Sequence, residues 1–235
     1  RVLQASGKDR ELVVRVPPTL ADCRRLGLDV VSWMQQGLVD TVIGGGGFIP
    51  FSTPLDEFVE AARPAGCRVL GCFEALRPFL DEEAMRAAAA RYWTAGADGL
   101  YLFNYYSMPN DWRRRVLGLL SDPAAVAVAD KRYELDRSPR PETRTQLWLS
   151  FRNAIPLVQL PLTLWDTPEG GGAALEIEVA DDIEGALAEG RLKKVVLGLG
   201  FETLVAADAL QVQLNGLPLA WGDRQVPTKP WVRCD

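Results

Sequence analysis

One carboxylate, Glu74, lies at the end of a predicted strand, a position typical of catalytic residues in strand–helix folds. Glu74 closes the apolar run at 68–74, at the point where a buried strand should reach solvent. The chain contains no histidine, so the commonest general base and metal ligand is missing and a carboxylate is the natural remaining candidate. A glycosidase needs two carboxyl groups astride the scissile bond, and strand ends hold such groups rigidly. Glu74 is therefore the candidate catalytic residue, although it could also face solvent or pair with Arg77.

Further polar side chains fall near the same predicted edge. Asn104, Tyr105 and Tyr106 follow the apolar run at 100–103, and their amide and phenol groups suit hydrogen bonding to sugars and stacking on them. Packing at the strand end would also explain them. Arg15 interrupts an apolar strand and must find a partner if it is buried. It could hold a substrate, or it could form a salt bridge. These four are the candidate substrate-binding residues.

Cofactor and metal chemistry find little support. The glycines at 44–47 precede a predicted helix and could cradle a phosphate or a flavin with backbone N–H groups, but a tight or flexible loop is the favoured interpretation. The cysteines match no zinc or redox spacing, and buried thiols are the plainer interpretation. They are Cys23, Cys67, Cys72 and Cys234. Without histidine, neither a Ser-His-Asp triad nor a histidine metal site can form in this chain. We expect no cofactor and no metal.

A regular alternation of strands and helices must position these residues. Strands are predicted at 12–16, 39–43, 69–73 and 100–103. Helices are predicted at 19–36, 54–62, 81–95 and 112–120. Gly27 could interrupt the first helix, after which Asp29 is a predicted N-cap, and Thr53 is a predicted N-cap for the second helix.

The approach to each strand repeats. A glycine ends the preceding helix at Gly37, Gly66 and Gly96. Asp40 and Asp98 then stand at the opposite strand end from Glu74. That end of a barrel usually serves stability, so these aspartates are expected to make loop and cap hydrogen bonds.

Four strand–helix units are half of a (β/α)8 barrel. We predict an α/β plus β fold, the C-terminal half of such a barrel followed by a small β-sandwich. An open sheet is the alternative, but a half barrel has two exposed edges, and we expect the other half to precede this chain. The predicted domains are 1–136 for the barrel units, 137–144 for a linker and 145–235 for the sandwich. Predicted sandwich strands include 155–165, 174–180, 194–199 and 209–214, and Asn215-Gly216 should join the last of these to 217–221 in a hairpin.

Four short segments carry a family resemblance. They are GLDVVSW at 27–33, GLVD at 37–40, GADGLYLFN at 96–104 and DKRY at 130–133. With them, residues 10–135 resemble the bacterial family-10-like glycosyl hydrolases, and the later region is similar to the accessory region of such proteins. The resemblance implies that the four strands are the fifth to eighth of the barrel, with Glu74 as nucleophile at the end of the seventh. The acid/base partner would end the fourth strand, outside this chain.

The amino-acid composition limits the classes of partner that this protein is expected to bind. A hydrophobic content of 48% and a charged content of 24% are typical of a globular protein, and a net charge of -5 gives no reason to expect nucleic acid. No apolar stretch is long enough to span a bilayer. The expected partner is a carbohydrate substrate or ligand, and the residues leave the oligomeric state and the compartment open. The resemblance is compatible with an extracytoplasmic location. Two alternatives to a glycosidase stand: a non-catalytic carbohydrate-binding or cell-surface protein, and a flavin- or phosphate-binding barrel.

Overall fold

The chain forms two compact units, Arg1–Asp181 and Asp182–Asp235. The computed structural model describes residues 10–45, 53–74, 82–103, 105, 109–135, 159–160, 162–164, 171–201 and 210–219. The side chain of Glu74, at the end of a strand, is not among the described atoms.

The first unit is built on a parallel sheet of four strands. These are β1 (Val13–Val16), β2 (Thr41–Gly44), β3 (Arg68–Glu74) and β4 (Gly99–Phe103). Their order in the sheet is their order in the chain, and every neighbouring pair is parallel. All four strands predicted from the sequence are confirmed, each to within two residues.

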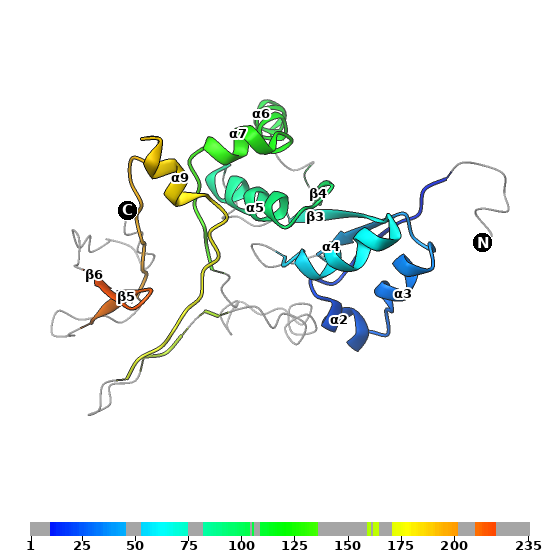
Figure 1. The fold of residues 1–235 in the computed structure, drawn as a ribbon, viewed down its shortest axis with the longest axis horizontal. Helices are drawn as coiled ribbons and strands as arrows, with labels where there is room; N and C mark the ends of the chain where they lie inside the picture. The colour runs from blue at the N-terminus through cyan, green and yellow to red at the C-terminus, as the bar shows by residue number, and fades with distance from the viewer. Residues whose placement is uncertain are drawn as a thin grey trace. The chain divides into compact units, whose positions relative to one another are not determined.

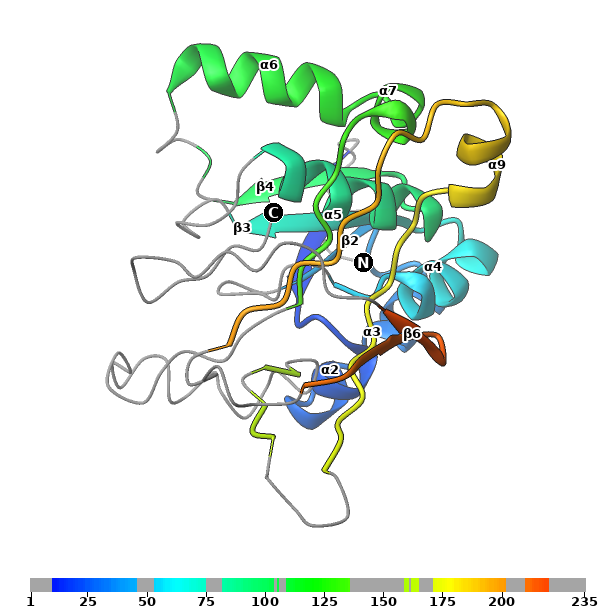
Figure 2. The same cartoon turned by 90° about the vertical axis from the view of Figure 1, so that its left-hand side faces the viewer.

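Helices fill the connections between the strands (Figure 1). They are α2 (Leu20–Arg25), α3 (Val30–Gln35), α4 (Asp56–Ala62) with the 3-10 turn η1 (Arg63–Ala65), α5 (Glu82–Thr94), α6 (Asn110–Leu120) and α7 (Pro123–Val128). The predicted break at Gly27 is present, with a positive φ of 78°. Asp29 caps α3, its side chain accepting a hydrogen bond from the backbone N–H of Ser32. Helices α6 and α7 pack against each other, and both contact α5 (Figure 2).

Glycine marks the return from helix to strand, as predicted. Gly37, Gly66 and Gly96 have φ values of +61°, +64° and +86°, the left-handed conformation that side chains disfavour. Each stands just before β2, β3 or β4, so the same backbone turn feeds three successive strands.

The N-cap prediction for Thr53 is wrong. Helix α4 begins at Asp56 with Leu55 as its N-cap residue and no side-chain cap. Thr53 lies buried two residues earlier, where its backbone N–H donates to the hydroxyl of Tyr92 at 3.2 Å. A contact with a residue distant in the chain thus prevails over the local capping preference.

The two faces of the sheet differ. In register, Val14, Val16, Val42, Val69 and Phe73 point to one face and join the core with apolar residues of α2 to α7. The opposite face, which we call the inner face, carries Val13, Arg15, Thr41, Ile43, Arg68, Leu70, Cys72, Tyr101 and Phe103, with Glu74 at the same parity. Its core is a separate cluster of Ile43 and Cys72 with Leu70, Tyr101 and Phe103. Among the described helices, none contributes to that cluster.

A contact between the edge strands indicates that the sheet curves. The guanidinium carbon of Arg15 in β1 lies 3.8 Å from the centre of the Phe103 ring in β4. In a flat sheet these strands would be about 14 Å apart, and the four-residue offset between Phe103 and Gly99, at the level of Arg15, would add about 13 Å along the strand. The resulting diagonal, about 19 Å, exceeds what the two side chains can bridge. The inner face is therefore concave.

Residues 178–181, at the end of the first unit, are bound to α5 and to the segment that follows α7. The Lys131 side chain is buried, and its Nζ lies 2.7 Å from Asp181 Oδ1. Tyr133 donates its hydroxyl proton to the other oxygen of Asp181 at 3.1 Å. Arg91 of α5 donates from Nε to the carbonyl oxygen of Glu178 at 3.0 Å. These contacts explain why residues up to 181 belong to the first unit.

The second unit holds α9 (Ile183–Ala188) and an antiparallel pair, β5 (Val212–Leu214) and β6 (Leu217–Leu219). The predicted Asn215-Gly216 hairpin is confirmed, and the φ values of 51° and 80° are those of a type I′ turn.

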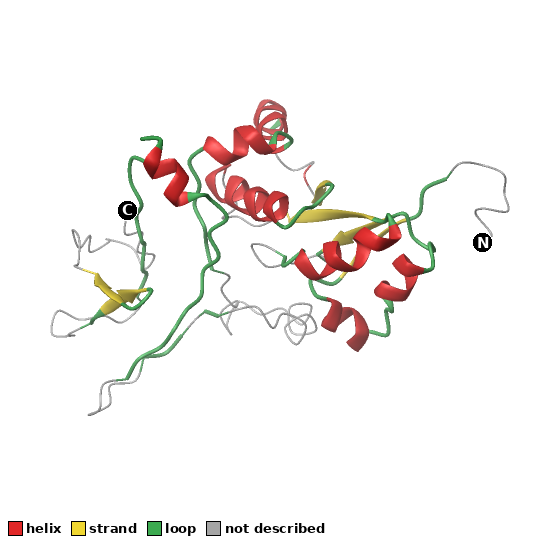
Figure 3. Cartoon of the chain, viewed as in Figure 1, coloured by secondary structure: helices red, strands yellow, loops and turns green. Residues whose placement is uncertain are grey.

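Two further strand predictions are not matched. Residues 171–181 and 191–201, which include the predicted strands 174–180 and 194–199, are described without strand (Figure 3). Strand propensity measures fit to neighbouring strands, and no neighbour pairs with these segments in the described chain. The β-sandwich therefore stays a prediction.

None of the helices in the described ranges has both the length and the apolar character needed to cross a membrane.

Candidate functional site

Glu74 occupies the last position of β3, as predicted. Its register partner is Phe103, the last residue of β4, so both stand at the carboxyl edge of the sheet. Alternation along β3 puts Glu74 on the inner face with Cys72 and Leu70. In sheets whose helices cover one face, the carboxyl ends of parallel strands are the usual place for binding and catalysis.

Arg15 also belongs to the inner face, and its partner is aromatic. The side chain is exposed rather than buried, so no desolvation cost forces an ion pair. Its guanidinium lies over the Phe103 ring at 3.8 Å, a cation–π contact. The backbone of Arg15 is level with Leu70 in the register, but its guanidinium reaches Phe103, the register partner of Glu74.

A buried tyrosine that the sequence did not single out fixes the strand beneath Glu74. Tyr92 of α5 is fully buried, and its hydroxyl donates to the carbonyl oxygen of Cys72 at 2.9 Å. The same hydroxyl accepts from the backbone N–H of Thr53 at 3.2 Å. A Cβ at Gly71 would lie 2.4 Å from the Tyr92 ring, and Phe73 meets the ring edge-on at 5.3 Å between centroids. Tyr92 therefore contacts the three residues that precede Glu74.

The one feature of the sequence that could have indicated this contact is Gly71, a glycine in the middle of β3. Gly71 lacks the side chain that would collide with Tyr92. A sequence pattern shows that something approaches closely, but it does not identify the approaching residue.

The three predicted residues after β4 have different outcomes. Tyr105 is buried in the helix-side core, with its ring 5.8 Å from that of Trp112. Burial raises the pKa of Tyr105 to about 12. Its hydroxyl has no hydrogen-bond partner in the described part of the chain. This placement favours packing over substrate binding for Tyr105, whereas Asn104 and Tyr106 lie outside the described residues.

The glycine-rich stretch does not present a phosphate site in the described chain. Gly44 belongs to β2, where a Cβ would lie 2.6 Å from the Leu55 side chain, so close packing explains it. Gly46 and Gly47 lie outside the described residues. The helix that follows begins with Asp56 and Glu57, whose carboxylates repel an anion at that end.

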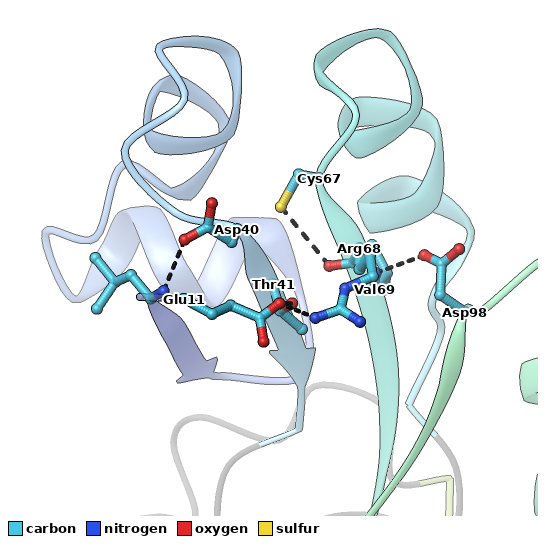
Figure 4. Close-up of polar contacts among 8 residues, drawn as sticks. Glu11, Asp40, Thr41, Cys67, Arg68, Val69 and Asp98 are labelled. Atoms are coloured by element: carbon cyan, nitrogen blue, oxygen red, sulfur yellow. Dashed lines mark hydrogen bonds and ion pairs between the residues drawn. The ribbon is translucent and has the colours of Figure 1, made fainter. Parts of the chain in front are cut away.

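The opposite edge of the sheet is structural, as predicted for Asp40 and Asp98 (Figure 4). Asp40 Oδ2 accepts from the backbone N–H of Leu12 at 2.7 Å, while its own N–H donates to the Leu12 carbonyl oxygen at 3.0 Å. Asp98 repeats this pair of bonds with Val69, both at 2.8 Å. Each aspartate thus closes the amino end of the preceding strand.

A shallow pocket of about 210 Å³ lies at this structural edge, away from Glu74. Its lining includes Cys67, Arg68 and Asp98. Arg68 is ion-paired with Glu11, and burial raises the pKa of the Cys67 thiol. The protonated thiol, the ion-paired Arg68 and the hydrogen-bonded Asp98 favour a structural role for this pocket.

The described cysteines are free and buried, in agreement with the sequence prediction. Burial, followed by the neighbouring carboxylates of Glu57 and Asp22, raises the pKa of Cys23 to about 12. Within the described ranges, no group of three or more histidine, cysteine, aspartate or glutamate side chains could hold a metal ion.

Comparisons with known proteins add no relative. The chain matches no protein-family model, and no curated protein matches it. The resemblance to family-10-like glycosyl hydrolases therefore rests on the four short sequence segments alone and stays a prediction.

Proposed function

We propose that this chain carries the nucleophile of a glycoside hydrolase that acts on a poly- or oligosaccharide, and that Glu74 is that nucleophile. The observation that carries the proposal is the place of Glu74, the last residue of β3 on the inner face, at the carboxyl edge of an all-parallel sheet. Such an edge holds a carboxylate rigidly while leaving it open to a substrate.

We also propose that the four described strands are half of a (β/α)8 barrel. Parallel sheets are almost always covered on both faces, yet the described helices pack on one face only. The inner face is concave with an apolar cluster, and β1 and β4 are the edge strands of the sheet in the described residues. Four more strand–helix units would cover that face and pair both edges, as in a (β/α)8 barrel.

In this mechanism the Glu74 carboxylate attacks the anomeric carbon as the bond to the leaving oxygen breaks. A second carboxyl group, proposed to end another strand, gives its proton to that oxygen. The same group then removes a proton from water, whose oxygen attacks the anomeric carbon. The ester bond to Glu74 breaks, and both carboxyl groups return to their starting states.

The test is a kinetic comparison of the full-length protein with its Glu74→Gln variant over a panel of polysaccharides and aryl glycosides. We expect kcat to fall by at least about 1,000-fold, because an amide cannot act as the nucleophile. Glu60→Gln is the control, since Glu60 is an exposed carboxylate on α4. Unchanged hydrolysis by the Glu74 variant would rule out the assignment.

The phosphate and flavin alternative is weakened by the acidic start of α4. The carbohydrate-binding alternative makes a different prediction from the glycosidase: glycan binding that survives in both variants, with no hydrolysis by any of the three proteins.

A further inference from the structure

Arg15 is a charged residue beside the apolar cluster of the inner face. On that face its register partner in β2 is Ile43, which is 4% exposed, and its nearest neighbour along β1 is Val13. The exposed Arg15 side chain needs no partner while water reaches it, but it needs a negative partner when a bound ligand excludes that water. The negative group that Arg15 binds can be inferred from its contacts.

The Phe103 ring holds the guanidinium without using its hydrogen-bond donors. The guanidinium carbon lies 3.8 Å from the centre of the ring, in a cation–π contact. This contact does not use the N–H groups of the guanidinium as hydrogen-bond donors, so they stay available for a ligand. Arginine is the side chain best suited to a carboxylate, because its planar fork matches the two oxygens. Arg15 is thus anchored and still able to bind.

Several other described arginines are already ion-paired. Ion pairs join Arg25 to Asp22, Arg68 to Glu11, Arg115 to Glu82 and Arg191 to Glu189. Among the residues that the structure describes, no carboxylate lies within ion-pair distance of Arg15. The anchored cation at the carboxyl edge therefore has no described counter-charge.

We infer that Arg15 binds an acidic group of the substrate, which makes the substrate a carboxylated saccharide such as a chain of uronic acid residues. The inference rests on the proposed function, because it takes the carboxyl edge beside Glu74 to be the sugar site.

A second role for Arg15 is separable from this one. If Arg15 served Glu74, its charge would favour the ionised carboxylate whatever the substrate. Loss of the charge would then shift the acidic limb of the pH–rate profile for neutral and acidic substrates alike. If Arg15 binds the substrate, its loss raises KM for acidic substrates only.

The experiment uses the full-length protein, Arg15→Gln, Arg15→Lys and the control Arg24→Gln, an exposed arginine of α2. The probes are uronic-acid oligosaccharides, their carboxyl-reduced neutral counterparts and sulfated oligosaccharides. Binding is measured by calorimetry in the Glu74→Gln background, and hydrolysis in the background with Glu74 intact.

We expect the parent protein to prefer the uronic-acid probes to their reduced counterparts. Arg15→Gln should weaken their binding by about 10- to 100-fold, with no change for the neutral probes, since charge-assisted hydrogen bonds are lost. Arg15→Lys should restore part of the affinity, and Arg24→Gln should bind like the parent. Equal effects on acidic and reduced probes, a preference for sulfated probes, or no binding of any uronic-acid probe would overturn the inference. Binding that depends on Arg15 but occurs without hydrolysis would support the inference while contradicting the proposed glycosidase.

Discussion

The hydroxyl of Tyr92 and the carbonyl oxygen of Cys72 are 2.9 Å apart and hydrogen-bonded within the core. This bond joins α5 to β3 two residues before Glu74, from the face opposite to the one on which Glu74 stands. The same hydroxyl accepts from Thr53, where the chain returns toward α4. The Tyr92 hydroxyl therefore binds the backbone at two places, in β3 and in the segment that precedes α4.

Replacing Tyr92 by phenylalanine should destabilise the protein by about 1–3 kcal/mol, because a buried N–H and a buried carbonyl oxygen each lose a partner. Chemical denaturation measures the free energy of unfolding. Tyr105→Phe is the matched control, since its hydroxyl is buried and has no hydrogen-bond partner in the described chain. That variant should be neutral or slightly more stable. Equal losses for the two variants would show that the Tyr92 hydrogen bonds contribute nothing.

Replacing Gly71 by alanine should cost about 1–3 kcal/mol or more, because the added Cβ would lie 2.4 Å from the Tyr92 ring and a packed core cannot yield that much. Gly118→Ala provides the contrast within the same protein. Gly118 lies in α6 with no atom within 4 Å of the added Cβ, so that variant should gain about 0.5–1 kcal/mol from helix propensity. Thermal unfolding of both variants checks the difference in sign.

The aspartates of the amino edge should matter for stability and not for catalysis. Asp40→Ala and Asp98→Ala each remove the acceptor of a backbone N–H, at Leu12 and Val69, and each should cost about 1–2 kcal/mol. Asp130→Ala, at an exposed position outside the helices and strands, should cost less than about 0.5 kcal/mol. A fall in kcat at temperatures where the Asp40 and Asp98 variants are fully folded would contradict a purely structural role.

The Cys23 thiol should make stability depend on pH in the alkaline range. Burial and nearby carboxylates raise its pKa from 9.0 to about 12, so the folded state favours the neutral thiol. That contribution is complete below the unfolded pKa and is lost as pH rises through the folded pKa. Unfolding free energies at about pH 8 and about pH 10.5 should therefore fall more for the parent than for Cys23→Ala. Parallel losses in the two proteins would place the alkaline sensitivity elsewhere.

Local patterns predicted the elements well because local physics controls them. The branched runs at 13–16 and 41–44 form the strands, and the Asn215-Gly216 turn forms the hairpin, since both residues accept a positive φ. The repeated Gly and Asp approach to each strand also follows from nearby residues. These features need no knowledge of distant contacts.

Predictions failed where a distant residue decides. Thr53 is a good N-cap by type, but its backbone binds Tyr92, which lies 39 residues away in the sequence. The contact between Arg15 and Phe103 depends on the curvature of the whole sheet, which no single segment specifies. Residues 174–180 have strand composition, yet the contacts near their end are to α5 and to the segment after α7. Strand composition alone does not supply a pairing partner.

Covalent trapping of the nucleophile tests the assignment of Glu74 most directly. The full-length protein is incubated with activated 2-deoxy-2-fluoro glycosides, including uronic-acid forms, and the labelled peptide is identified by mass spectrometry. A fluorinated sugar slows hydrolysis of the glycosyl ester, so a nucleophilic carboxylate stays labelled. We expect one added glycosyl group on the peptide that contains Glu74, and none in Glu74→Gln. Labelling of another carboxylate, or unchanged labelling of the Glu74→Gln variant, would contradict the assignment.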